Sequence, residues 1–301
     1  MPHSTSADLA AQPRSRERAG GRRLGDLTVS SIGMGAMTLT QMPDYDVARG
    51  VRAVHAALDA GITLFDTADT YGPVAGYGVN EEALIRALRS YSGSIDDVIV
   101  ATKGGHTRHA GNTWWLDGSA AHLRAACQAS IRRLGLDPLP LYQHHRPDPQ
   151  RPYAESMHGL KDLYDEGLVR RVGISNANPA QIREAAQILG PALVSVQNEF
   201  SPRFRSSEPE IALCAELGLA FLAWSPLGGM REAKGLGETA SAFARVAEER
   251  GVSPQRVALA WALAKDPCVI PIPGASRPES VLDSVAAIEL ELVAEELALL
   301  G

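Results

Sequence analysis

Short apolar runs alternate with longer segments of helical periodicity from about residue 30 almost to the end of the chain. Eight of these runs are rich in β-branched or other apolar residues and are followed by glycine or polar positions, which predicts strands. The predicted strands are Ser31–Gly33, Thr63–Asp66, Asp97–Thr102, Leu139–Gln143, Arg170–Ile174, Leu193–Gln197, Ala220–Trp224 and Val269–Ile272. The predicted helices are Asp46–Ala60, Asn80–Ser90, Ser119–Leu134, Tyr153–Glu166, Pro179–Leu189, Glu208–Glu216 and a final group that includes Pro254–Ala264.

Two of these helices begin at residues that suit an N-cap. Asn80 precedes two glutamates, which favour the first turn of a helix, and Asn178 stands directly before Pro179. We therefore expect the second helix to be capped by Asn80 and the fifth by Asn178.

The repeated order of strand and helix predicts a parallel sheet. Eight such units without a linker or a change of composition favour one closed α/β barrel, the (β/α)₈ or TIM barrel, over an open doubly wound sheet. The open sheet would need a three-glycine turn after its first strand, and the segment Gly33-Met34-Gly35 supplies only two glycines. We expect a single barrel domain over residues 21–301 and a disordered polar tail over residues 1–20.

Composition limits the classes of partner. A net charge of -6 argues against a nucleic-acid-binding protein, and no stretch approaches the roughly 20 apolar residues of a membrane span. The chain begins without the apolar core of a secretory signal. Its three cysteines, Cys127, Cys214 and Cys268, are far apart and form no metal-binding pattern. We expect buried free thiols, no metal site and a cytoplasmic location.

Polar side chains follow the predicted strands at the end where barrel enzymes carry their active sites. Asp66 ends the run TLFD and Lys103 follows DVIVAT. A charged Lys103 inside a barrel mouth requires a partner, and Asp66 is the acidic residue one strand earlier. Tyr71 lies five residues after Asp66, so we expect its phenol beside the ammonium, which would lower the phenol pKa and make Tyr71 a proton donor near neutral pH.

Seven segments, in order and spacing, resemble the aldo-keto reductase family: FDTADTYG, VIVATKGG, LYQHHRPD, GISNAN, VQNEFSP, WSPLGG and IPIPGASRP. The resemblance covers about residues 22–300 and implies that Asp66, Tyr71, Lys103 and His145 are the catalytic residues. It also implies hydride transfer from C4 of a reduced nicotinamide to a carbonyl carbon, with Tyr71 protonating the oxygen and His145 orienting it. The adjacent His144 is expected to point away from the mouth.

The cofactor that the resemblance implies is NADPH, with NADH as the alternative. Trp224 replaces the tyrosine that commonly stacks on the nicotinamide, and Arg277 is the residue expected to bind the 2′-phosphate. The segment departs from the common pattern at Gly274-Ala275, where Lys-Ser is usual, and at Ser280 and Ser284. The implied cofactor residues are Gly35, Ala36, Met37, Asp66, Ser175, Asn176, Gln197, Trp224, Ser225, Pro226, Leu227, Gly228, Pro273, Gly274, Ala275, Ser276, Arg277, Ser280, Asp283 and Ser284.

The substrate is expected to be a small-molecule carbonyl compound bound between loops. The predicted walls of its pocket are Trp114, Trp115, Phe200 and Arg203. Two other functions are compatible with these residues: a Schiff-base lyase with Lys103 as nucleophile, and a nicotinamide-binding regulatory subunit of a channel-like partner. A monomer and a homo-oligomer are both left open.

Overall fold

The computed structural model describes residues 20–301 except for 42–44, 74–76, 110–112, 230–232 and 237–239. Of the tail predicted for residues 1–20, only Gly20 belongs to the described residues. None of the described helices is long and apolar enough to cross a membrane.

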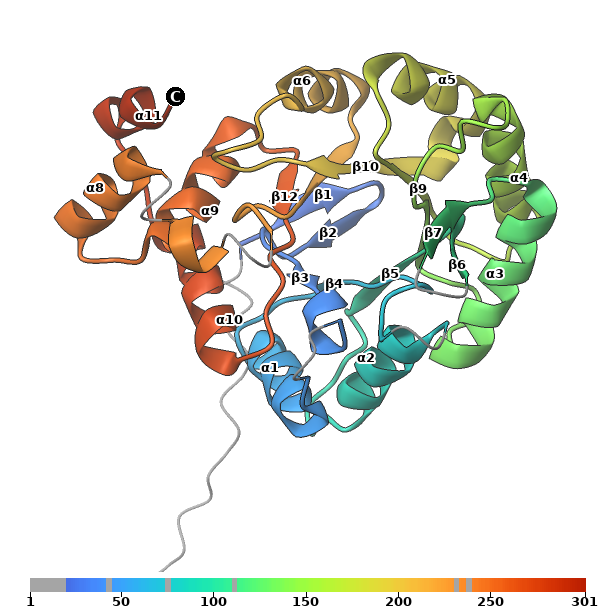
Figure 1. Ribbon diagram of the computed structural model, residues 1–301, viewed down its shortest axis with the longest axis horizontal. Coiled ribbons are helices and arrows are strands. Elements are labelled where there is room, and N and C mark those ends of the chain that lie inside the picture. The colour runs from blue at the N-terminus through green and yellow to red at the C-terminus, as the bar shows by residue number, and fades with distance from the viewer. Residues whose placement is uncertain (1–19, 42–44, 74–76, 110–112, 230–232, 237–239) are drawn as a thin grey trace, which may run out of the picture.

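Eight parallel strands form the centre of the molecule and follow one another in the order in which they occur in the chain (Figure 1). Backbone hydrogen bonds from Gly33 N to Pro271 O (2.9 Å) and from Gly35 N to Pro273 O (3.1 Å) join the last strand to the first and close the ring. The predicted barrel is therefore confirmed. The strands are β3 (Met34–Gly35), β4 (Leu64–Asp66), β5 (Ile99–Gly104), β8 (Leu141–His144), β9 (Val172–Ser175), β10 (Leu193–Glu199), β11 (Ala220–Trp224) and β12 (Val269–Pro271).

Helices surround this ring, while α8 and α11 lie to one side of it (Figure 1). The α-helices are α1 (Val47–Asp59), α2 (Val79–Arg89), α3 (Ala120–Leu134), α4 (Tyr153–Asp165), α5 (Pro179–Leu189), α6 (Glu208–Leu217), α8 (Ser241–Arg250), α9 (Pro254–Lys265), α10 (Pro278–Val285) and α11 (Ala294–Leu300). The short 3-10 helices are η2 (Met37–Leu39), η4 (Gly190–Ala192), η5 (Ala233–Gly235) and η6 (Ala286–Glu289).

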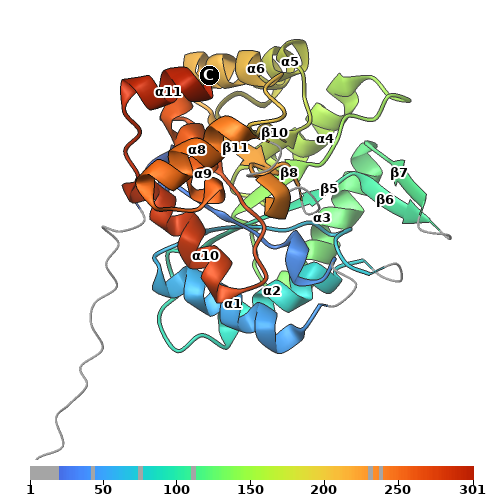
Figure 2. The same cartoon turned by 60° about the vertical axis from the view of Figure 1, so that its left-hand side comes forward.

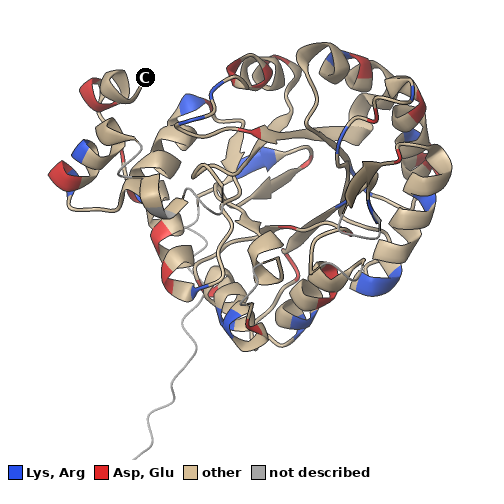
Figure 3. Cartoon of the chain, in the orientation of Figure 1, with Lys and Arg blue, Asp and Glu red and all other residues tan. Residues whose placement is uncertain are grey.

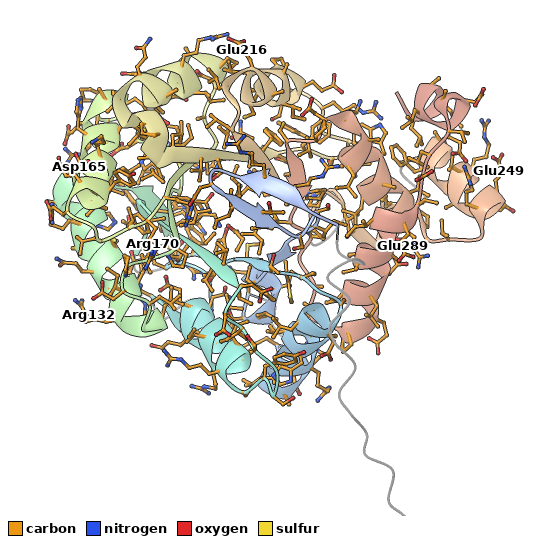
Figure 4. All side chains as sticks on the ribbon, turned by 180° about the vertical axis from the view of Figure 1, so that it is seen from behind. Arg132, Asp165, Arg170, Glu216, Glu249 and Glu289 are labelled. Carbon is orange, nitrogen blue, oxygen red and sulfur yellow. The ribbon has the colours of Figure 1, made fainter. Side chains whose placement is uncertain are left out.

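Two hairpins were not predicted. The first pairs β1 (Arg22–Leu24) with β2 (Leu27–Val29) and lies across one end of the barrel, as the view from behind shows (Figure 4). The second pairs β6 (His106–His109) with β7 (Thr113–Leu116) and stands out from the body (Figure 2). Strands of three or four residues are too short to show a clear period of two, so periodicity alone does not reveal them.

The first barrel strand and the second helix differ in detail from the prediction. The strand expected at Ser31–Gly33 forms instead at Met34–Gly35. Asn80 does not cap α2, because the helix begins one residue earlier, after Gly78 in the left-handed region with φ 86°. The Asn80 amide is buried and donates to Ala36 O at 2.8 Å, so it joins the first turn of α2 to the segment that follows β3. Asn178 does cap α5, with a complete capping box.

Two hydrophobic layers hold the barrel together. One fills the space between strands and helices, and the other fills the interior of the ring, where Leu24 and Val29 of the first hairpin also lie. Charged side chains are concentrated on the outer helices (Figure 3). Side chains alternate across a strand, so the residue two positions after an interior apolar residue also faces inward, at the strand's carboxyl end. This rule places Asp66 after Leu64 and Lys103 after Ala101.

Candidate active site

A cavity of about 730 Å³ opens at the carboxyl ends of the strands, and it is large enough for a dinucleotide and a small second molecule. Hairpin β6–β7 lies on one side of the ring and α10 on the opposite side (Figure 1). The lining includes Asp66, Tyr71 and His145 on the hairpin side and Arg277 on the α10 side. One continuous cavity therefore connects the predicted catalytic residues with the predicted phosphate-binding segment.

Lys103 is completely buried and makes three contacts with its ammonium group. Its Nζ donates to Asp66 Oδ1 at 2.5 Å and to Thr67 O at 2.9 Å, and it lies 3.3 Å from Tyr71 Oη. Burial lowers the pKa of Lys103, but the Asp66 carboxylate and the Tyr71 hydroxyl together more than offset this, and the pKa is held above its ordinary value. The amine is therefore an ammonium ion at neutral pH, which is the wrong state for a Schiff-base nucleophile.

Two glutamine side chains complete the contacts of Asp66. Oδ2 accepts from Gln143 Nε2 at 2.9 Å and from Gln197 Nε2 at 2.8 Å. Gln143 was not predicted, although its position two residues after the interior Leu141 could have revealed it. Three donors thus fix the carboxylate that positions the Lys103 ammonium.

The pKa of Tyr71 moves in the direction opposite to our expectation. Burial raises the pKa of the phenol above its ordinary value, and the charge of Lys103 lowers it by less than burial raises it. The sequence predicts the neighbouring ammonium but not how completely the hydroxyl is removed from water. Tyr71 is therefore a neutral phenol at physiological pH, the state in which it can donate a proton.

His145 lies beside Tyr71, with ring centroids 5.5 Å apart in an edge-to-face arrangement. Burial lowers the pKa of His145 well below its usual value, and the charges of Lys103 and Arg146 lower it further, so the ring is neutral. His144 is also buried but does not line the cavity, and its ring lies 6.0 Å from that of Tyr153 on α4. His144 therefore points away from the mouth, as the alternation along β8 requires.

The second hairpin supplies one wall of the cavity. His106 and Trp114 line it, with ring centroids 4.7 Å apart. Arg108 lies under Trp114, with its guanidinium carbon 4.4 Å from the ring centroid. The same guanidinium donates from Nη1 to the carbonyl oxygens of residues 70, 72 and 73, at 3.3, 2.8 and 3.3 Å. Arg108 thus ties this wall to the loop that carries Tyr71.

The structure corrects three of the four predicted substrate contacts. Phe200 is fully buried and stacks on Trp261 with ring centroids 5.0 Å apart, so it belongs to the outer hydrophobic layer. Arg203 is exposed and lies outside the cavity. Trp115 faces the side of β7 opposite to Trp114 and does not line the cavity. Sequence position identified the loops, but it could not tell which side of each loop faces the cavity.

Ser175, Asn176 and Gln197, which are predicted to bind the cofactor, all line the cavity and are linked by hydrogen bonds. Ser175 Oγ donates to Gln197 O at 2.6 Å, and Asn176 Nδ2 donates to His145 O at 3.0 Å. Asn176 and Ser225 adopt positive φ angles of 57° and 48°, which non-glycine residues rarely do. Both line the cavity, so this backbone strain is concentrated at the mouth of the barrel.

The α10 side of the cavity has the features of a phosphate site. Arg277 is the N-cap of α10, so its charge lies beside free backbone N–H groups and the positive end of the helix dipole. Gly35 approaches the backbone of the last strand so closely that a Cβ would lie 2.8 Å from Ile272 O. The Oγ1 atom of Thr38 and the Nε1 atom of Trp224 are buried without a partner and belong to lining residues. The residues present therefore fit a bound dinucleotide.

Most predicted cofactor residues line this cavity, but three of them differ from the expectation. Ala36 and Gly228 lie outside the lining. Asp283 lines it, yet its carboxylate accepts from Ser253 Oγ and from Arg256 Nη2 at 2.5 and 2.7 Å. The lining also includes residues that were not predicted to belong to the site, among them Thr38, Arg49, His106, Arg146, Gln255 and Glu279. Of these, Arg146 could have been predicted, because it directly follows the predicted catalytic residue His145.

Comparisons with known proteins agree with this geometry. A model of the aldo/keto reductase family matches residues 31–300. An uncharacterized oxidoreductase of Schizosaccharomyces pombe is 34% identical over 297 residues, which cover 97% of this chain and 92% of that protein. The glycerol dehydrogenase AKR11B4 of Gluconobacter oxydans is similar in structure, with a TM-score of 0.79, 26% identity and 94% of each chain covered.

A second similar structure is an aldo/keto reductase of Klebsiella pneumoniae in complex with NADP and acetate, with a TM-score of 0.78, 26% identity and 93% of each chain covered. The family model extends over nearly the whole barrel, from the first parallel strand to α11. The chain therefore belongs to the aldo/keto reductase family and is an NAD(P)H-dependent oxidoreductase.

Proposed function

We propose that the protein reduces an aldehyde or ketone to an alcohol with NADPH, and that Asp66, Tyr71, Lys103 and His145 carry out the chemistry. The observation that carries the proposal is the position of Tyr71. Its hydroxyl lies 3.3 Å from the buried Lys103 ammonium, and its ring lies edge-to-face with the neutral His145 ring, in a cavity that continues to Arg277.

When bound, the reduced nicotinamide supplies the hydride that the carbonyl carbon accepts. Tyr71 donates its proton to the carbonyl oxygen, and the Lys103 ammonium stabilises the phenolate that remains. His145, as a neutral ring, donates a hydrogen bond to the same oxygen while negative charge develops on it. Asp66 holds Lys103 in place and keeps it protonated, so it acts on the proton donor through the ammonium.

NADPH is the preferred cofactor in this proposal because Arg277 lies at the beginning of α10, where a phosphate dianion would be favoured. The similar Klebsiella pneumoniae structure contains NADP. Free cysteines are typical of a reducing compartment, and Cys127, Cys214 and Cys268 are all free, which supports our further proposal of a cytoplasmic location.

The test is the loss of dihydronicotinamide absorbance when the purified protein is mixed with NADPH or NADH and a panel of aldehydes, ketones and keto-sugars. We expect turnover with NADPH and a weaker response with NADH. In Arg277→Ala, NADPH binding should weaken by roughly tenfold or more, because a charge-assisted hydrogen bond to phosphate is lost, while NADH binding changes little.

Arg203→Ala is the matched control, because it removes an exposed arginine outside the cavity. It should leave both cofactor affinities close to those of the parent protein. Absence of NADPH oxidation with every member of the panel would contradict the proposed reaction. Equal weakening of both cofactors by Arg277→Ala would contradict the role of Arg277 alone.

The pH dependence of reduction follows from two pKa shifts. Tyr71 must be protonated, and its pKa is raised above the ordinary value near 10, so reduction is lost only when the pH rises through that raised value. His145 must be neutral, and its pKa is lowered well below 6.5, so the loss of activity at low pH should begin well below pH 6.5. We expect kcat/KM for a neutral aldehyde at saturating NADPH to stay constant between about pH 7 and about pH 9. A rise or fall of kcat/KM with a midpoint between about pH 7 and about pH 9 would contradict the roles assigned to Tyr71 and His145.

A further inference from the structure

Arg146 is a cation at the cavity that has no role in the chemistry proposed above. Arg146 follows the catalytic His145, lines the cavity and is exposed to solvent. Its guanidinium makes no hydrogen bond or ion pair with any residue that the structure describes. An arginine that faces a binding cavity without a protein partner has all its donors available for a ligand.

No nearby carboxylate of the described residues pairs with the positive charge of Arg146. Asp66, the acidic residue of this side of the lining, is neutralised by Lys103. The nearby Glu199 does not line the cavity and forms no ion pair with Arg146; burial raises the pKa of this carboxyl above its ordinary value, and the charge of Arg146 offsets only part of that rise. The other acidic lining residues, Glu279 and Asp283, belong to α10 on the opposite side of the ring.

The rest of this side of the cavity carries no charge that would compete for an anion. The pKa of His106 is lowered to about 4 by burial and by the charges of Arg146 and Arg108, so its ring is neutral near pH 7. Trp114 adds a flat apolar surface beside it. A ligand group on this side therefore meets one free guanidinium, neutral rings and the Tyr71 hydroxyl.

We propose that Arg146 determines substrate specificity and selects carbonyl compounds that carry an anionic group, a carboxylate or a phosphate, bound to its guanidinium. This inference rests on the proposed function, because it assigns the substrate class of the same site. A planar guanidinium can bind either anion through two parallel hydrogen bonds, which fixes orientation as well as affinity. The carbonyl of the same molecule then lies at Tyr71 and His145.

The experiment compares two aldehydes that differ mainly in charge, 4-carboxybenzaldehyde and its methyl ester. The parent protein should reduce the carboxylate with a kcat/KM roughly tenfold or more above that of the ester. In Arg146→Gln this ratio should fall to about one, mainly through a higher KM for the carboxylate, and Arg146→Lys should restore part of it. Added KCl should reduce the preference of the parent protein, because part of the attraction is screened.

Arg170→Gln is the matched control. It removes the same charge from an exposed arginine in the loop before β9, at the amino end of that strand and far from the mouth (Figure 4). The ratio should keep its parent value in this variant. A fall in Arg170→Gln equal to that in Arg146→Gln would show that net charge alone sets the preference and would overturn the inference.

A second pair, glyceraldehyde 3-phosphate and glyceraldehyde, distinguishes the two anions. The pair that shows the larger preference dependent on Arg146 identifies carboxylate or phosphate as the bound group. Equal reduction of the charged and neutral member in both pairs would overturn the role of Arg146 and leave the reductase proposal intact. Absence of reduction of all four aldehydes and of the whole carbonyl panel would instead remove the proposed function itself.

Discussion

Tyr71→Phe should lower kcat for carbonyl reduction by about 10²–10⁴-fold while NADPH binds almost as well as before. The substitution removes one hydroxyl, the one that lies 3.3 Å from Lys103 Nζ, and keeps the ring that packs beside His145. Steady-state kinetics and fluorescence titration with NADPH measure the two quantities separately. The loss should appear in kcat and in kcat/KM alike, because the proton is transferred only as the transition state forms.

Tyr164→Phe is the matched control for this variant. Tyr164 lies on the outer helix α4, where its ring packs near the Lys161 ammonium, so removal of its hydroxyl should leave turnover unchanged. If Tyr71→Phe kept the turnover of the parent protein, the proton would have to come from another group, and His145 is the neighbouring candidate.

Lys103→Met should destabilise the folded protein by about 3–5 kcal/mol and abolish most turnover. The substitution keeps an apolar chain of similar length but leaves the buried Asp66 carboxylate without its cation. The two glutamine donors remain, but they carry no charge to compensate the carboxylate. Urea unfolding measures the change in the free energy of unfolding.

The double variant Asp66→Asn with Lys103→Met separates stability from catalysis. It removes both charges, so much of the lost stability should return while turnover stays low, since no ammonium remains beside Tyr71. Lys161→Met is the control for the loss of a lysine at the surface. Its ion pair with Asp165 is partly exposed, and the expected cost is below about 1 kcal/mol. Recovery of turnover in the double variant would contradict the role assigned to Lys103.

The barrel could be predicted from the sequence because most of its strands lie in apolar runs that end at a polar residue. That same feature located Asp66 and Lys103, whose side chains follow the interior layer by two positions. Tyr71 could be placed only through its distance from Asp66 along the loop. The pattern of apolar strand segments was therefore enough to predict the fold and the residues at the centre of the candidate site. The roles of these residues remain our proposals.

The remaining differences arise from properties that no local pattern encodes. Phe200 follows a strand as the site residues do, but it turns toward Trp261 in the outer layer. The direction of the Tyr71 pKa depends on how deeply the hydroxyl is buried, which the chain determines only after it has folded. Gln143 was not predicted as a site residue because it lies in the motif LYQHH, where the two adjacent histidines are the more obvious candidates.

The contacts of Arg108 join the hairpin that forms a wall of the cavity to the loop that carries Tyr71. Its guanidinium packs against the face of the Trp114 ring and donates to backbone carbonyl oxygens on both sides of Tyr71. A displacement of the hairpin that reshapes the pocket wall should therefore also move Tyr71, the proton donor in the proposed mechanism. If the proposed mechanism holds, substrate choice and reaction rate both depend on this arginine, so redesign of the hairpin for a new carbonyl compound should preserve Arg108 or replace its contacts with the tyrosine loop.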